Sequence, residues 1–101
     1  MLVELHTGAY CERALENDTA GVARELVRIT KAAKAAADLG IEVHAGHGLT
    51  FATVAAIARL PQVVELNIGH FLVGEAIFTG IGPAIGRMRA LMTEARAEAH
   101  A

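Results

Sequence analysis

Three short segments of the chain alternate apolar and polar residues, and longer segments with apolar residues at helical spacing lie between them. The alternation predicts strands over residues 2–6, 41–45 and 63–68. Strands separated by helical crossovers form right-handed βαβ units, in which the strands pair in parallel. The pattern therefore predicts an α/β fold, and no shift in composition divides the chain into separate domains.

Helix signals occupy the segments between and after these strands. A long helix is expected to follow the Asn17–Thr19 connection and to end at Leu39, because Gly40 is a good stop. Tyr10 and Cys11 are expected in a loop before it. A short helix capped by Thr50 and ended by Pro61 should precede the third strand.

Two helices are expected after the third strand. The first is short and covers residues 71–78, and the segment 79–82 breaks it from the second. Pro83 suits the first position of the last helix, and the tail from Arg96 is expected to fray.

The three strands share a repeat. VELHTG (3–8), IEVHAG (41–46) and VELNIG (64–69) each read apolar, Glu, apolar, His or Asn, any residue, Gly. Because strand side chains alternate, the polar residues and glycines share one face and the aliphatic residues the other. An open doubly wound sheet buries both faces under helices. One polar face therefore favours part of a closed (β/α)8 barrel, whose site lies at the carboxyl ends of the strands.

Glycine and histidine residues gather at those strand ends. Gly46-His47-Gly48 and Gly69-His70 follow successive strands, and a short helix follows the second pair. Glycine lets backbone N–H groups approach an anion, and a helix N-terminus favours negative charge. Phosphate binding is one interpretation of these loops, and plain turn formation is the other.

The polar side chains of the strands allow several roles. His47 stands between two glycines with little local structural purpose, so a proton-transfer or binding role is expected. His6 and His44 are expected to be hydrogen-bonded residues of the barrel wall. Glu4, Glu42 and Glu65 need partners in a barrel interior, and a polar layer plugging the barrel floor is an equal alternative for Glu42 and Glu65.

Composition removes several classes of function. Nine Lys and Arg face eleven Asp and Glu, which argues against nucleic acid as a partner. The longest apolar runs are too short to cross a membrane, and Glu4 interrupts the first of them, so no signal peptide is expected. One cysteine, Cys11, fits a reducing compartment, and a cytoplasmic chain without cofactor is expected. His44 and His47 point to opposite strand faces, which disfavours a metal site.

The ordered motifs resemble the pyridoxine 5′-phosphate synthase family. VELHTG (3–8), AGHGLT (45–50) and ELNIGH (65–70) match it in order and spacing, and the resemblance extends over essentially all 101 residues. It implies a TIM barrel of which this chain supplies the last three βα units, strands 6–8. The family condenses 1-deoxy-D-xylulose 5-phosphate with 3-amino-2-oxopropyl phosphate and releases pyridoxine 5′-phosphate, phosphate and water.

The resemblance also implies roles for individual residues. His47 would be the proton donor and Glu4 would stabilise a transition state, while Gly48, Gly69 and His70 would hold the phosphate of the amino-ketone. The proton acceptors of the family and most contacts to the deoxyxylulose phosphate come from earlier strands. We therefore expect the 101 residues alone to be inactive, and the complete protein to be a homo-oligomer. A non-catalytic phosphate-binding half-barrel, closed by another chain, is the main alternative. A metal-dependent barrel hydrolase using His44, His47 and His70 is a weaker one.

Overall fold

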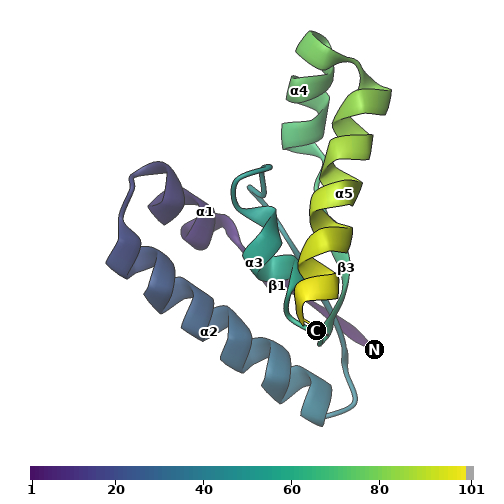
Figure 1. Cartoon of the computed structure of the whole chain (residues 1–101). Coiled ribbons are helices and arrows are strands. Elements are labelled where there is room, and N and C mark those ends of the chain that lie inside the picture. The colour runs from purple at the N-terminus through teal and green to yellow at the C-terminus, as the bar shows by residue number, and fades with distance from the viewer. Residues whose placement is uncertain (100–101) are drawn as a thin grey trace.

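The computed structural model describes residues 1–99, in which three strands alternate with helices (Figure 1). The strands are β1 (Leu2–His6), β2 (Glu42–Gly46) and β3 (Val63–Asn67). The helices are α1 (Gly8–Leu15), α2 (Thr19–Asp38), α3 (Val54–Ala58), α4 (His70–Thr79) and α5 (Ile81–Ala99). The predicted α/β fold is confirmed.

The strands form one parallel sheet in the order β1-β2-β3, so that neighbours in space are also neighbours along the chain. Val3 lies opposite Val43, which lies opposite Val63, and these residues belong to the aliphatic face. The register between β2 and β3 is irregular beside Val43, where β3 carries one extra residue, Val64. Parallel pairing in chain order is the arrangement that consecutive βα units of a barrel require.

The aliphatic face of the sheet is the core of the protein. Val43, Ala45 and Val63 are fully buried there, together with Ile29 of α2 and Ile57 of α3. Burying an isoleucine or valine side chain contributes about 1.5–3 kcal/mol, so this face stabilises the fold. Figure 1 shows α2 lying along one side of the sheet, with α1 beside its upper end, while α3 lies against α5.

Helix α1 corrects the prediction of a loop around Tyr10 and Cys11. The helix begins directly after β1, where the Cys11 N–H donates to the Thr7 carbonyl oxygen at 3.0 Å. Tyr10 and Cys11 turn inward and are nearly fully buried. Gly8 is the only other buried residue of α1, and three buried positions close together in eight residues make no helical period in the sequence. Asn17, with a positive φ of 56°, turns the chain from α1 into α2.

The other helix boundaries differ from the predictions in instructive ways. Asp18 caps α2 as expected, because its carboxylate accepts from the Gly21 N–H at 2.9 Å. Thr50 does not cap α3: residues 51–53 form a turn, in which the Thr50 N–H donates to Thr53 Oγ1. Gly80 alone breaks α4 from α5, so Pro83 is the third residue of α5, still within the first turn.

Helix α5 does not fray from Arg96 but continues to Ala99. The Arg96 guanidinium donates to the carbonyl oxygens of Leu60, at 3.2 Å, and of Val63. These contacts dock the last helical turn against the start of β3. The two residues after Ala99 lie outside the described part of the chain.

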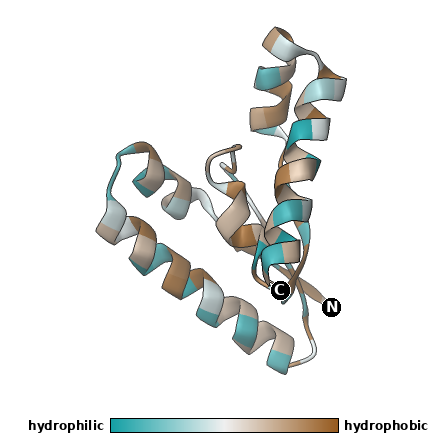
Figure 2. Ribbon diagram, in the orientation of Figure 1, coloured by the Kyte–Doolittle hydropathy of each residue, from teal (hydrophilic) through white to brown (hydrophobic). Residues whose placement is uncertain are grey.

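Helix α4 and the first half of α5 form a helical hairpin that extends beyond the sheet (Figure 1). Helix α4 buries no residue completely, and Val73, Ile77 and Phe78 are largely exposed. Figure 2 shows hydrophobic segments on both arms of this hairpin. The outer edges of β1 and β3 have no strand partner within residues 1–99. No helix among those residues is long and apolar enough to span a membrane.

Candidate active site

A cavity of about 470 Å³ lies at the carboxyl ends of the strands. It is lined by residues of β1, of the loops after β2 and β3, and of the start of α4. All five residues proposed from the sequence line it: Glu4, His47, Gly48, Gly69 and His70. Residues separated by up to 66 positions in the chain thus face one space that could hold a small molecule.

His47 has an uncommon backbone conformation for a residue with a side chain, since its φ is +89°. Gly48 follows with a φ of +81°. The Thr7 hydroxyl, which is fully buried, donates to the His47 carbonyl oxygen at 2.7 Å. A conformation of this kind costs about 1–3 kcal/mol and persists only where neighbouring structure holds it. The backbone of His47 is therefore held in one conformation, which places its imidazole at the cavity.

The imidazole of His47 stacks on that of His6, with 4.2 Å between ring centroids and 26° between ring planes. Nδ1 of His6 accepts a hydrogen bond from the Gly8 N–H at 3.2 Å. His6 is therefore hydrogen-bonded, as expected from the sequence. The expectation did not include its contact with His47, which only the strand register brings about.

Glu4 lies on the polar face of the sheet, one residue pair below His6. Gly46 makes room for its side chain: a Cβ atom on Gly46 would lie 2.8 Å from Glu4 Oε1 and 2.8 Å from the Asn67 carbonyl oxygen. The Glu4 carboxylate is exposed on this face. The sequence repeat places Gly46 on the polar face, and the strand register shows that it leaves space there for Glu4.

The three strand glutamates do not form one layer, which corrects the layer implied by the sequence repeat. Glu4 lies opposite His44, which lies opposite Glu65, whereas Glu42 lies opposite Leu2. The repeat aligns like residues, but β2 is displaced by two residues relative to β1 and β3. Because the displacement is even, the polar face is preserved.

His44 is hydrogen-bonded between two carboxylates. Its Nε2 lies 2.7 Å from Glu42 Oε2 and its Nδ1 3.0 Å from Glu65 Oε2, and the side chain is 11% exposed. Both nitrogens of His44 are thus occupied. Within residues 1–99 no group of three or more His, Cys, Asp or Glu side chains is arranged to hold a metal ion.

The loop after β3 leads directly into the N-terminus of α4. The first intrahelical bond of this end runs from the Val73 N–H to the Gly69 carbonyl oxygen, at 3.0 Å. The preceding N–H groups of the first turn are therefore available to an anion at the cavity. A Cβ on Gly69 would meet no atom within 4 Å, and no positive φ is recorded for this residue. Neither packing nor backbone conformation within residues 1–99 demands glycine there.

The cavity also includes residues that were not singled out from the sequence. They are Leu49, Asn67, Ile68 and Phe71. Asn67 occupies the position in β3 that His6 occupies in β1, and the repeat could have indicated it. Phe71 packs edge-on against Phe51 at 4.7 Å, and no periodicity in the sequence announces this contact.

Cys11 is not a nucleophile of this site. Burial raises the pKa of its thiol, and hydrogen bonds with Thr53 and Thr7 oppose the shift only in part. The thiol is therefore protonated at neutral pH, and a protonated thiol is a poor nucleophile.

A parallel α/β sheet with a cavity at its carboxyl edge, lined by a helix N-terminus, histidines and a carboxylate, is typical of enzymes that act on small anionic molecules. The sequence model of the family described as "Pyridoxal phosphate biosynthesis protein PdxJ" matches residues 1–94. The chain belongs to this family.

Curated relatives carry the name pyridoxine 5′-phosphate synthase. The protein of Caulobacter vibrioides is 58% identical over 97 residues, which cover 96% of this chain and 38% of the relative. The protein of Ruegeria pomeroyi is 58% identical over 96 residues, 95% of this chain and 39% of the relative. The protein of Cereibacter sphaeroides is 59% identical over 95 residues, which cover 94% of this chain and 38% of the relative. The chain thus spans less than two fifths of these relatives and matches their C-terminal portion.

Proposed function

We propose that this chain forms the last three βα units, strands 6–8, of a (β/α)8 barrel that acts as a pyridoxine 5′-phosphate synthase. The reaction joins 1-deoxy-D-xylulose 5-phosphate with 3-amino-2-oxopropyl phosphate and gives pyridoxine 5′-phosphate, phosphate and water. A complete barrel of this type has about 250 residues. The chain supplies the site for the amino-ketone phosphate and the proton donor.

One observation carries the proposal: Glu4, His47, Gly48, Gly69 and His70 all line a single cavity of about 470 Å³. These residues come from all three βα units. Parallel strands bring these loops to one edge of the sheet whatever their function, and at that edge the five residues border a space large enough for a small phosphorylated molecule.

The two glycines at the cavity have different purposes. Gly48 needs to be glycine for the backbone, since its φ is +81° and a Cβ would lie 3.2 Å from Cys11 Cβ. Gly69 has no such need, so the close approach of a ligand is the remaining reason for it. A phosphate that accepts from the N–H groups at the start of α4 supplies that reason, and His70 adds an imidazole donor beside it.

The chemistry requires protons to be moved at both carbon and oxygen. Imine formation, dehydration and ring closure each include such a step, and an imidazole exchanges protons readily near neutral pH. His47 borders the cavity and acts as the donor. The Glu4 carboxylate, on the adjoining strand face, stabilises positive charge that develops on the iminium nitrogen.

A graft tests the proposal. The matching C-terminal segment of the Caulobacter vibrioides relative is replaced by this chain, and pyridoxine 5′-phosphate formation is measured beside the unaltered relative. We expect the chimera to turn over both substrates. A chimera that folds, by circular dichroism and hydrodynamic size, but forms no product would overturn the proposal.

A second candidate is a non-catalytic phosphate-binding module that closes by pairing with another chain. The observation that favours it is the hairpin of α4 and α5, whose residues Val73, Ile77 and Phe78 are largely exposed. Phosphate binding by the chain together with a stable hetero-complex, and an inactive but folded chimera, would favour this candidate over the enzyme.

A further inference from the structure

We propose that His6 is a positioning residue, which holds the His47 imidazole in the orientation needed for proton donation. This inference rests on the proposed function of His47. The two rings lie 4.2 Å apart at 26°, a stacked geometry in which each covers one face of the other. His47 is exposed in a loop, so without this contact its side chain would sample several rotamers.

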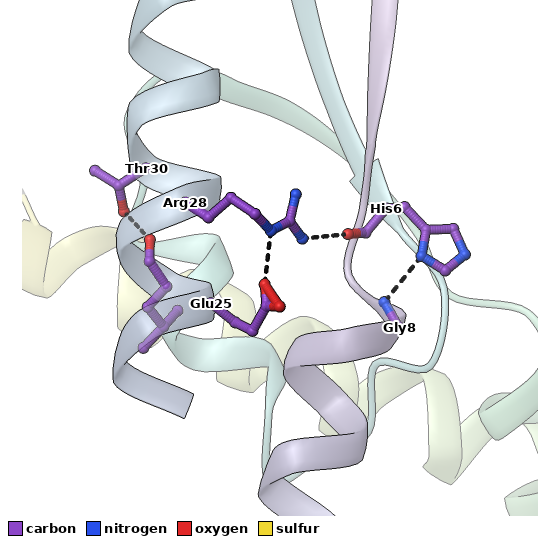
Figure 3. Close-up of polar contacts among 6 residues, drawn as sticks. His6, Gly8, Glu25, Arg28 and Thr30 are labelled. Carbon is purple, nitrogen blue, oxygen red and sulfur yellow. Dashed lines mark hydrogen bonds and ion pairs between the residues drawn. The ribbon is translucent and has the colours of Figure 1, made fainter. Parts of the chain in front are cut away.

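His6 can serve as a support because it is itself fixed at two points (Figure 3). Its Nδ1 accepts from the Gly8 N–H at 3.2 Å, and its carbonyl oxygen accepts from an Arg28 N–H at 3.3 Å. Arg28 is in turn paired with Glu25 at 2.6 Å on the same helix. Ring and backbone of His6 are therefore tied to α1 and to α2, respectively.

The bond from the Gly8 N–H also limits how the His6 ring can turn. Because Nδ1 of His6 accepts this bond, rotating the ring would break it, so the ring keeps the face that it stacks on His47.

Gly8 is built to accommodate the pair. A Cβ atom on Gly8 would lie 2.5 Å from His6 Cε1 and 2.9 Å from His47 Cδ2, closer than real contacts allow. The neighbouring residue Thr7 holds the backbone of His47 through its hydroxyl, at 2.7 Å. Three consecutive residues at the end of β1 thus fix His47. His6 holds its side chain, Thr7 holds its backbone, and Gly8 leaves space for its ring.

Two substitutions separate the functions of His6. In His6→Asn the amide oxygen can still accept from the Gly8 N–H, but the stacked ring is lost. In His6→Phe a flat ring remains, but the acceptor is lost. Both are made in the chimera described above, and His44→Asn is the control, because it removes a hydrogen-bonded strand histidine that does not stack on His47.

We expect His6→Asn to lower kcat by roughly 10- to 100-fold while KM for the amino-ketone phosphate stays within about threefold. His6→Phe should recover a large part of kcat. In spectra of ¹⁵N-histidine-labelled chimera, the His47 ring signals should move in His6→Asn, because the ring current of His6 is lost, and should stay in place in His44→Asn.

The outcomes distinguish this inference from the proposed function. An active chimera in which His6→Asn changes neither kcat nor the His47 signals would overturn the positioning role and leave the proposed function standing. Equal loss in His6→Asn and His6→Phe would also overturn it, since the ring would then not matter. An inactive chimera refutes the proposed function, and the His47 signals still decide whether the rings stack.

Discussion

The Thr7 hydroxyl donates a 2.7 Å hydrogen bond to the carbonyl oxygen of His47, 40 residues further along the chain. This bond ties the end of β1 to the loop after β2 and holds a backbone conformation that only neighbouring contacts can maintain. The same bond therefore contributes to the stability of the fold and to the position of His47 at the cavity.

Thr7→Val should therefore reduce both stability and activity. The substitution keeps the shape of the buried side chain but leaves the His47 carbonyl oxygen with only the weak contact of the Cys11 thiol at 3.8 Å. We therefore expect a loss of about 1–2 kcal/mol in the free energy of unfolding. Thr30→Val is the matched control: its hydroxyl also donates to a carbonyl at 2.7 Å, but on an exposed helix face. It should change stability by less than about 0.5 kcal/mol, measured by urea unfolding. Equal losses in the two variants would contradict a special role for Thr7.

His47→Ala should remove the proton donor while leaving the phosphate site. In the chimera we expect turnover to fall by roughly 10²- to 10⁴-fold. Binding of inorganic phosphate, measured by calorimetry, should weaken far less, because the N–H groups at the start of α4 remain. If phosphate binding and turnover fell by the same factor, His47 would be mainly a binding residue.

Gly69→Ala and Gly48→Ala should have different effects. Gly69→Ala meets no atom within residues 1–99, so thermal unfolding should be nearly unchanged while phosphate binding weakens by about tenfold or more. Gly48→Ala is strained by its positive φ and should lower stability by about 1 kcal/mol or more. Unchanged phosphate affinity in Gly69→Ala would speak against an anion at this loop.

Stability should decline at alkaline pH. Burial raises the pKa of both the Cys11 thiol and the Tyr10 phenol above their ordinary values. The folded protein then holds these protons more tightly than the unfolded chain, so unfolding releases protons. The stabilisation is fully present below the ordinary pKa of cysteine, 9.0, and is lost as pH rises beyond it.

Urea unfolding at several pH values between 8 and 10.5 measures how the free energy of unfolding changes with pH. The control is the double variant Cys11→Ala with Tyr10→Phe. The double variant should show a flatter dependence on pH than the parent chain. An identical slope would show that other groups cause the alkaline loss.

The purified 101-residue chain should form no pyridoxine 5′-phosphate by itself. By the family resemblance, the proton acceptors and most contacts to the deoxyxylulose phosphate come from strands outside it. The measurement is product formation with both substrates at high protein concentration. Turnover above the uncatalysed rate would refute the division of labour proposed here.

Much of the fold was predictable because apolar and polar residues alternate in each strand. The polar and aliphatic faces, the parallel order and the long helix after Asp18 follow from local pattern. Helix α1 was not predictable, since Tyr10 and Cys11 are its only large buried side chains. The shared level of Glu4 and His44 also could not be read from the repeat, because register is decided by pairing between strands.

Five of the residues that line the cavity were predictable from the sequence, but the contacts that hold them in place were not. Glycines and histidines at strand ends mark the cavity in the sequence, and resemblance singled out Glu4. The stack of His6 on His47 and the space left by Gly8 depend on how two strand ends meet. Contacts of this kind join residues that are distant in the chain, so they produce no periodic pattern in the sequence.

The order β1-β2-β3 has an evolutionary consequence. Because the strands are adjacent both in the chain and in the sheet, this block meets any further strands only along two edges. Recombination between genes could exchange such a block whole, bringing all the residues that line this cavity with it while disturbing only two strand pairings. A cavity whose lining residues are contiguous in the gene can thus be inherited as one unit.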